Sequence, residues 1–360
     1  MKKLIRLTPL EPYFLGGEHI FEMEKGNRQY FIRSLDTPSQ TTLFGALRFM
    51  AIKNPQPLSE FKQRMKQYQA NFESREWKRE FHGFALNRPG VNFDKINSIS
   101  PLYLARETEG ELEFFIRTPL IHKSGPREMD TEPYAPMHFD LPARPVLTDN
   151  GLRCFPTDYS AKDGLTDSWL SLSCKTVYKH LFTSAVKVGI NKQRTNPSAN
   201  QQSTEEGFFK KEYKMLPAGY SFAFLADVDE NFELHNFVVY LGQGRSPFQV
   251  KEDAVDGAML QKLAIPAGLL PNGMVCAQSD LYYTGDVREL YALCKFVCVE
   301  TRAHRLFQVN NLDRKDSRLI QLIRAGSVFW PDDPIAFVDK LRNRHAAVAG
   351  FNQLIGGQGQ

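Results

Sequence analysis

The chain has few cysteines, and their positions suggest no framework. There are five, an odd number, and their spacings match no zinc-binding pattern: Cys154, Cys174, Cys276, Cys294 and Cys298. Both observations argue against a disulfide scaffold and against a structural zinc site. Cys294 and Cys298 lie four residues apart in an apolar stretch, which predicts ordinary helical packing. We therefore expect reduced thiols.

Long apolar runs are also missing. The sequence contains no stretch long enough to span a bilayer and no signal-peptide pattern. Together with reduced thiols, this predicts a cytoplasmic protein with no membrane partner.

Signatures of catalysis and of cofactor binding are absent too. There is no Walker loop, no G-x-S-x-G and no H-E-x-x-H, and the eight histidines are scattered. The segment YLGQGRSPF lacks the third glycine of a dinucleotide fingerprint, and Pro247 would break the helix that should follow. We predict that the protein is not an enzyme and that it holds no cofactor and no metal.

The remaining composition is that of a folded, mildly basic protein. The 360 residues are 42% hydrophobic and 24% charged, with a net charge of +4. This length allows one large domain or two of ordinary size. The charge is compatible with a local basic groove but does not by itself establish nucleic-acid binding. The 27 phenylalanines leave some aromatic rings for base stacking.

The stretch Asp36–Arg48 predicts a turn followed by a capped helix over 41–53. Pro38 ends the preceding element, and a hydroxyl-rich start formed by Ser39, Thr41 and Thr42 can cap unpaired N–H groups. Gly45 lies inside this helix, where glycine is costly, so we expect a strand or a ligand to approach the backbone there. A helix start of this kind suits phosphate, although a capped core helix explains the same residues.

Hydrophobic periodicity predicts the other elements. Residues 118–170 are rich in proline, which excludes long regular elements there. The predicted helices cover 58–68, 70–82, Lys175–Phe182 and Pro334–Leu341. The predicted strands are Lys3–Leu10, Leu112–Arg117, Ser184–Ile190 (with Val186 and Val188 facing inward), Phe208–Leu216, Phe222–Leu225, Phe237–Leu241, Leu281–Tyr283, Arg305–Val309 and Gly326–Trp330.

Two polar segments carry basic side chains. His19–Arg33 is predicted to be a polar connection with Lys25, Arg28 and Arg33. Asn191–Gly207 is predicted to be a long polar loop between two strands. Near it, Lys187, Lys192 and Arg194 can neutralise phosphates, and Asn191 can hydrogen-bond to a backbone or a base edge.

Several motifs resemble one protein family. A first strand, a loop and then P-S-x-T-T-L-x-G-A-L-R resembles the RAMP superfamily of CRISPR effector proteins, and in particular the type III-B Cmr subunit that caps the 5′ handle of the guide RNA. The unit VGINKQRTNPSANQQSTEEGFFKKEY, the strand RAGSVFW and the glycine-containing loop at Gly350 are similar to the same superfamily in the same order.

The resemblance implies an α+β fold built from two tandem ferredoxin-like (RRM-like) RAMP modules with long loop insertions. The N-terminal module would cover residues 1–172, with helical and proline-rich insertions. The C-terminal module would cover residues 173–360 and end in a glycine-rich loop.

The same resemblance implies a non-catalytic guide-RNA-binding subunit of a type III-B CRISPR effector. It would grip the crRNA 5′ handle and bridge the large polymerase-like subunit to a backbone RAMP subunit. The predicted RNA contacts are Lys25, Arg28, Arg33, Thr41, Arg48, Lys187, Asn191, Lys192, Arg194 and Arg245, with Gly350 and Phe351 giving close backbone approach and stacking.

Other functions remain open at this point. Some RAMP relatives cleave CRISPR repeat RNA without metal, and Tyr178, Lys179 and His180 on a predicted helix could supply the acid and the base. A purely architectural subunit and a capping subunit of a related type III system are further alternatives.

Overall fold

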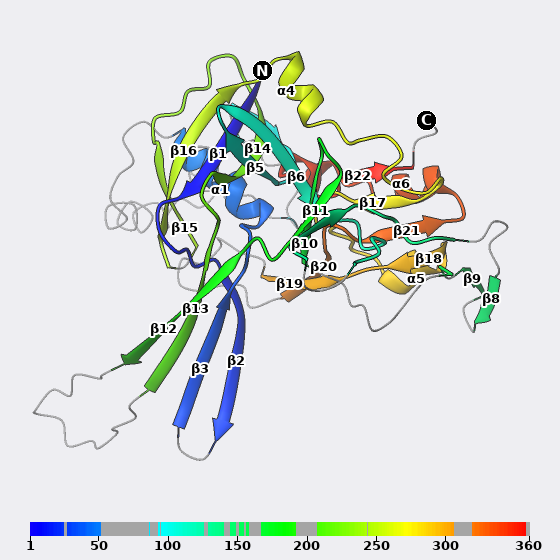
Figure 1. Ribbon diagram of the computed structural model, residues 1–360, viewed down its shortest axis with the longest axis horizontal. Coiled ribbons are helices and arrows are strands. Elements are labelled where there is room, and N and C mark those ends of the chain that lie inside the picture. The colour runs from blue at the N-terminus through cyan, green and yellow to red at the C-terminus, as the bar shows by residue number, and fades with distance from the viewer. Residues whose placement is uncertain are drawn as a thin grey trace, which may run out of the picture.

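The computed structural model shows a mixed fold of many strands and few helices, which confirms the α+β class (Figure 1). The predicted arrangement as tandem ferredoxin-like modules remains a prediction. The structure describes residues 1–24, 27–51, 86, 93, 95–125, 129–139, 145–148, 151–154, 156–157, 167–191, 207–242, 244–305 and 319–357. The described helices are α1 (Gln40–Met50), α4 (Gly257–Lys262), α5 (Val287–Ala292), α6 (Pro334–Leu341) and α7 (Arg344–Val348).

A large sheet forms the body of the molecule. Among the described residues it has ten strands in the order β15-β16-β1-β14-β5-β6-β10-β11-β7, with β4 also paired to β14. All its pairings are antiparallel. Its strands are β1 (Lys2–Pro9), β4 (Ile96–Ile99), β5 (Tyr103–Thr108), β6 (Glu111–Arg117), β7 (Thr131–Pro133), β10 (Ser168–Ser171), β11 (Thr176–Lys179), β14 (Tyr220–Val228), β15 (Val238–Leu241) and β16 (Ser246–Ala254).

This sheet is shared by both halves of the chain. β1 lies between β14 and β16, two strands more than 200 residues further along the sequence. The predicted boundary at 172/173 falls between β10 and β11, which are neighbours in the same sheet. The two predicted modules therefore meet within one continuous sheet.

Helix α1 covers one face of the body and follows the predicted pattern. Ser39 is its N-cap and accepts a hydrogen bond from the Thr42 N–H. The periodic residues Leu43, Leu47 and Met50 are fully buried in the main hydrophobic core. Gly45 is exposed, and nothing lies within 4 Å of the position of an added Cβ. The expected close approach of a strand is therefore wrong, at least for the described residues.

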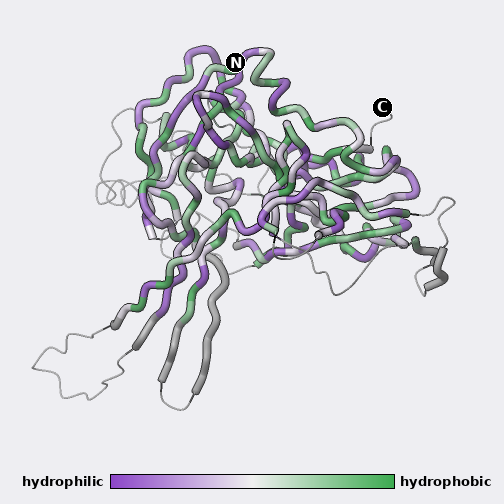
Figure 2. The backbone as a smooth tube through the Cα atoms, in the orientation of Figure 1, coloured by the Kyte–Doolittle hydropathy of each residue, from purple (hydrophilic) through white to green (hydrophobic). Residues whose placement is uncertain are grey.

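A smaller sheet and three helices form the C-terminal part. Its strand order is β18-β21-β17-β22, and two short hairpins, β19–β20 and β8–β9, stand apart from it. Figure 2 shows hydrophobic and hydrophilic stretches alternating along the body rather than one long apolar run. The strands of the smaller sheet and of the two hairpins are β8 (Pro145–Thr148), β9 (Gly151–Cys154), β17 (Val275–Ala277), β18 (Cys294–Cys298), β19 (Thr301–Arg305), β20 (Leu319–Ile323), β21 (Val328–Pro331) and β22 (Leu354–Gly356).

A third sheet extends away from the body, and we call it the arm (Figure 1). Its strand order is β12-β13-β3-β2, and β13 pairs with β3 in parallel. Its strands are β2 (Gly16–Glu24), β3 (Asn27–Ser34), β12 (Thr183–Asn191) and β13 (Gly207–Met215). The predicted polar connection His19–Arg33 is therefore wrong, because its residues form the β2–β3 hairpin.

Most of the sequence-predicted strands are confirmed as β1, β6, β12, β13, β14, β15 and β21, and the helix Pro334–Leu341 is confirmed as α6. The predicted helix Lys175–Phe182 is wrong, because its β-branched and aromatic residues form β11. Cys294 and Cys298 lie on strand β18 rather than on a helix.

The inward orientation predicted for two valines is also wrong. Val186 is 55% exposed and Val188 is 62% exposed, since the arm has no core behind this face. The predicted helices at 58–68 and 70–82 and most of the predicted loop Asn191–Gly207 lie outside the described residues. In the part of the chain that the structure describes, no helix is both long and apolar enough to cross a membrane.

Candidate nucleic-acid interface

The arm brings together basic residues from two distant segments of the sequence. Arg28 and Arg33 lie on β3, and Lys187 and Asn191 lie on β12, more than 150 positions later. β13 joins the two strands by pairing with both. Predicted RNA contacts from separate segments of the sequence thus share one four-stranded sheet.

One face of the arm carries two opposed lysines. Lys187 on β12 lies directly opposite Lys211 on β13. Like charges in directly opposite positions destabilise an antiparallel pair. A bound polyanion would remove this repulsion, so the pair favours a phosphate backbone on this face, which we call the basic face.

Aromatic rings support both lysines of the basic face. The Lys187 Nζ lies 4.6 Å from the ring centre of Tyr213, and the Lys211 Nζ lies 5.5 Å from that of Phe14. The Phe14 and Tyr213 rings contact each other, with their centres 5.6 Å apart. These cation–π contacts hold the two ammonium groups on the same face of the sheet.

The opposite face of the arm carries acidic as well as basic side chains. Arg33 lies 3.7 Å from Glu212, and Lys214 lies 2.8 Å from Glu212 and 3.1 Å from Asp36. Burial lowers the pKa of Lys214, but its hydrogen bond to Glu212 and the charge of Asp36 outweigh this and raise it above the ordinary value. Arg33 and Lys214 therefore already have carboxylate partners, whereas Lys210 on the same face is exposed. The predicted contacts Arg33 and Lys187 lie on opposite faces.

A glycine turn packs against the base of the arm. Gly242 has φ +71°, and a Cβ there would clash with the Phe14 carbonyl oxygen. Arg245, three residues later, has φ +51° and lies over the Tyr240 ring at 5.7 Å. The turn thus follows the backbone beside Phe14 and presents Arg245 at the surface of the body.

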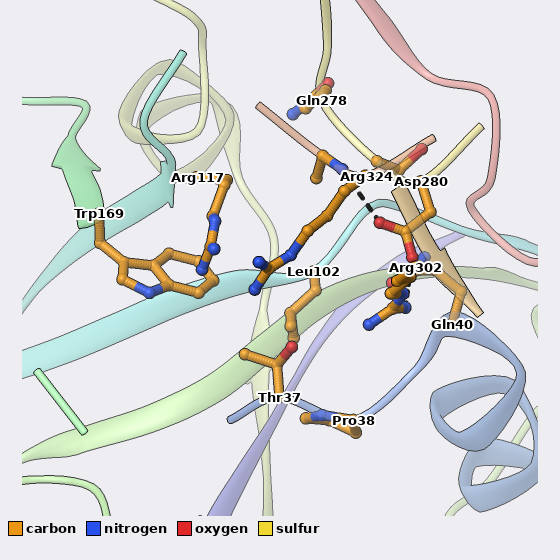
Figure 3. Close-up of a pocket in the computed structure, with 12 residues that line it drawn as sticks. Thr37, Pro38, Gln40, Leu102, Arg117, Trp169, Gln278, Asp280, Arg302 and Arg324 are labelled. Carbon is orange, nitrogen blue, oxygen red and sulfur yellow. Dashed lines mark hydrogen bonds and ion pairs between the residues drawn. The ribbon is translucent and has the colours of Figure 1, made fainter. Parts of the chain in front are cut away.

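The start of α1 borders a small pocket lined by arginines (Figure 3). Arg117, Arg302 and Arg324 come from β6, β19 and the turn before β21, and Thr37, Pro38 and Gln40 come from the start of α1. Three carboxylates balance the three guanidinium groups: Asp167 pairs with Arg117 and Arg324, Asp280 with Arg302, and Glu300 with Arg324.

The pocket is therefore charge-compensated. Burial, followed by the neighbouring Arg324, lowers the pKa of Arg117 to about 9, which leaves it charged at neutral pH. No sequence signal could have indicated this pocket, because its lining residues are separated by up to almost 290 positions and have no common motif.

Two predicted contacts on α1 lie in the body, away from the arm. The Thr41 hydroxyl lies 2.9 Å from that of Ser39, within the cap. The Arg48 guanidinium lies over the Phe93 ring at 5.8 Å, and burial lowers its pKa. Thr41 therefore contributes to the helix start, and Arg48 packs on an aromatic side chain.

Comparison with known proteins identifies the family of this chain. A family model described as CRISPR-associated protein (Cas_Cmr3) matches residues 5–358. The chain belongs to the Cas_Cmr3 family. This confirms the resemblance to a CRISPR Cmr subunit that the sequence motifs indicated. No curated protein matches the chain.

Chains of two solved structures are similar to this chain. A chain of "Cryo-EM structure of the Type III-B Cmr-beta bound to cognate target RNA" has 13% identity and a TM-score of 0.50, with 99% of this chain and 97% of that chain covered. A chain of the same complex "bound to cognate target RNA and AMPPnP, state 1" has 11% identity and a TM-score of 0.47, with the same coverage.

In this Cas_Cmr3 chain, Gly350 and Phe351 are both buried. Phe351 is fully buried in the main core, so its ring is not available for stacking on a base, and that prediction is wrong. Gly350 has φ +79°, and its close backbone approach is made to the protein itself, at the Gln40 amide and the Ser100 carbonyl.

The residues of the cleavage alternative do not share a helix face. Tyr178 and Lys179 are successive residues of β11 and point to opposite sides of the sheet. The Tyr178 hydroxyl lies 3.3 Å from Arg106, and the Lys179 Nζ lies 2.8 Å from Glu132. His180 follows in a left-handed conformation and is exposed. The predicted helix that would bring the three side chains to one face is therefore wrong.

The remaining predicted contacts are not placed by the structure. Lys25, Lys192 and Arg194 lie outside the described residues. Arg28 and Asn191 are located only by their positions on β3 and β12. Lys211, Phe14 and Tyr213 were missed by sequence reasoning, because their contribution depends on strand register.

Proposed function

We propose that this Cas_Cmr3 protein is a non-catalytic RNA-binding subunit of a type III-B CRISPR effector complex. It grips the 5′ handle of the guide RNA with the basic face of the arm. It bridges the large polymerase-like subunit to the backbone RAMP subunits. We extend the proposal to the fold, as two ferredoxin-like modules that share the body sheet.

The opposed pair Lys187 and Lys211 carries the proposal. These side chains place two positive charges on a sheet that extends from the body, with aromatic rings beneath them. Cations placed along a sheet surface can neutralise the phosphates of single-stranded RNA. The relatives in the Cmr-beta structures come from complexes bound to target RNA, which supports an RNA ligand for this chain.

The test is to purify the tagged protein from its own cells under native conditions and to sequence the bound RNA. We expect guide RNAs with one common 5′ end, together with other CRISPR subunits. The Lys187→Ala/Lys211→Ala double variant should recover less RNA, whereas the Lys210→Ala variant on the opposite face should recover a normal amount. Protein that emerges alone and free of RNA would overturn the proposal.

A second experiment tests for catalysis. The purified protein is incubated with repeat RNA in EDTA. We expect intact RNA, since the Tyr178 hydroxyl contacts Arg106 and the Lys179 ammonium is paired with Glu132. A discrete product that is lost in His180→Ala would establish the nuclease alternative instead.

A further inference from the structure

An apolar patch lies on the outer surface of the body sheet, next to its β15 edge. It consists of Leu10, Val238, Tyr240 and Pro247, and we call it the β15 patch. Tyr240 lies opposite Pro247 in the β15–β16 pairing. On the other side of β16, the Leu10 N–H donates a hydrogen bond of 3.1 Å to the Pro247 carbonyl. The four side chains thus lie side by side across three neighbouring segments.

The β15 patch is exposed, whereas the reverse side of the same strands is core. Leu10 is 55% exposed, Val238 is 43% exposed and Tyr240 is 58% exposed. The alternate residues of β15, Val239 and Leu241, are only 1% and 4% exposed. One side of β15 is therefore buried in the hydrophobic core. The other side exposes apolar surface to solvent.

A cation marks the border of the β15 patch. The Arg245 guanidinium lies over the Tyr240 ring at 5.7 Å. Among the described residues, no carboxylate forms an ion pair with Arg245, in contrast to the arginines of the pocket near α1. Tyrosine and arginine are, with tryptophan, enriched in the energetically dominant parts of protein interfaces.

The chemistry of the β15 patch suits a protein better than RNA. Leu10 and Val238 have no π-face for a base and no hydrogen-bonding group for a phosphate. One cation, Arg245, borders the patch, whereas the basic face of the arm has two opposed lysines. β15 is moreover the last strand in the order of the body sheet, where a neighbouring chain can approach.

We propose that the β15 patch is the docking surface for a neighbouring protein subunit of the effector complex. The partner presents an apolar surface with a carboxylate facing Arg245. This inference rests on the proposed function in one respect, since it assumes that the protein works inside an assembly. It assigns Arg245 to a protein contact in place of the RNA contact that the sequence suggested.

The experiment is site-specific photocrosslinking in the assembled complex. A photoreactive phenylalanine analogue replaces Tyr240, the complex is purified with its RNA, and the crosslinked product is identified by mass spectrometry. We expect a crosslink to one peptide of another protein subunit, with an Asp or Glu nearby. A crosslink to RNA, or no crosslink in an intact RNA-containing complex, would overturn the inference and leave the proposed function standing.

A charge exchange then tests the role of Arg245. Arg245→Glu should weaken incorporation of the protein into the complex by at least about tenfold, and Tyr240→Ala by about thirtyfold. Changing the crosslinked partner's acidic residue to Lys should restore the incorporation of Arg245→Glu. The inference fails if no such restoration occurs.

Matched controls on α6 separate docking from folding. Ile335, which is 65% exposed, and Arg342, which has a 61% exposed side chain, lie on or directly after this helix. Ile335→Ala and Arg342→Glu should leave incorporation unchanged. RNA affinity of the isolated Arg245→Glu variant should also be unchanged, whereas failure of the proposed function would appear as a wild-type protein without bound RNA.

Discussion

The basic face of the arm predicts a specific change in the salt dependence of RNA binding. Lys187→Ala and Lys211→Ala remove two cations that face the same way on adjacent strands. Each phosphate contact on single-stranded nucleic acid contributes about 0.7 to the slope of log affinity against log salt concentration. The double variant should therefore bind with a slope shallower by about 1.4.

This slope corresponds to a measurable difference in affinity. Between about 50 and about 200 mM salt, the wild-type protein should lose about sevenfold more affinity than the double variant, according to the same relation. The assay is a fluorescence-anisotropy titration of a guide RNA with its natural 5′ handle at several salt concentrations. A scrambled handle of the same length separates handle preference from general binding to RNA.

A single pair of variants provides the control. Lys210 is exposed, lies next to Lys211 on β13 and points to the opposite face. Lys187→Ala should reduce the slope by about 0.7, whereas Lys210→Ala should leave it unchanged. An equal effect of the two substitutions, or no effect of either, would refute the assignment of RNA to the basic face.

The stability of the double variant checks that the effect is not caused by unfolding. Removing two like charges in opposite positions relieves about 0.2–1 kcal/mol of repulsion. Loss of the two cation–π contacts costs about 0.5–1 kcal/mol each at exposed sites. The two contacts together outweigh the relieved repulsion, so the double variant should lose at most about 2 kcal/mol and the urea midpoint should fall slightly while unfolding stays cooperative.

Three predictions concern the body. Gly350→Ala should destabilise the protein by at least about 1–2 kcal/mol, because it combines a left-handed backbone with a clash at Gln40 and Ser100. The same change at Gly45, in the open part of α1, should stabilise the protein by about 1 kcal/mol. Urea unfolding measures both changes. Phe351→Ala should cost about 3–5 kcal/mol of stability without changing the RNA affinity of the folded protein, and a selective loss of affinity would restore the stacking role. Glu132→Gln removes the carboxylate 2.8 Å from the buried Lys179 and 2.7 Å from His122, and should cost about 3–5 kcal/mol near neutral pH. Burial raises the pKa of Glu132, but the bonds from Lys179 and His122 outweigh this and lower it, so its stabilisation is present above its unfolded pKa and is lost as the pH falls through the folded value. The difference between wild type and Glu132→Gln should therefore shrink in acid, as measured by thermal unfolding at a series of pH values.

Local signals were sufficient for part of the fold. The cap at Ser39 and the periodic leucines define α1 by contacts within a few residues, and Asp333 with Pro334 does the same for α6. Such elements can be predicted because their determinants are adjacent in sequence. The same is true of β6, whose apolar core follows a turn at Gly110.

Other elements depend on partners that the sequence does not reveal. The β2–β3 hairpin is rich in polar residues, which led to its interpretation as a loop, and its strand character is set by pairing with β13. Thr176–Lys179 has no distinctive period over four residues, and it becomes a strand between β10 and β7. Tertiary pairing decides the structure of short segments in which local preference is weak.

The contrast between local signals and strand pairing also applies to the proposed RNA site. Basic composition was enough to select Lys187, but it could not select Lys211 over Lys210, which carries the same charge one position earlier. The register between β12 and β13 makes that choice, because it places Lys211 opposite Lys187 and Lys210 opposite Val188. A one-residue slip would reverse both faces of β13 relative to β12. The proposed interface is therefore specified by the pairing of two strands, and a variant that shifts this register should abolish the basic face while keeping every lysine of the chain.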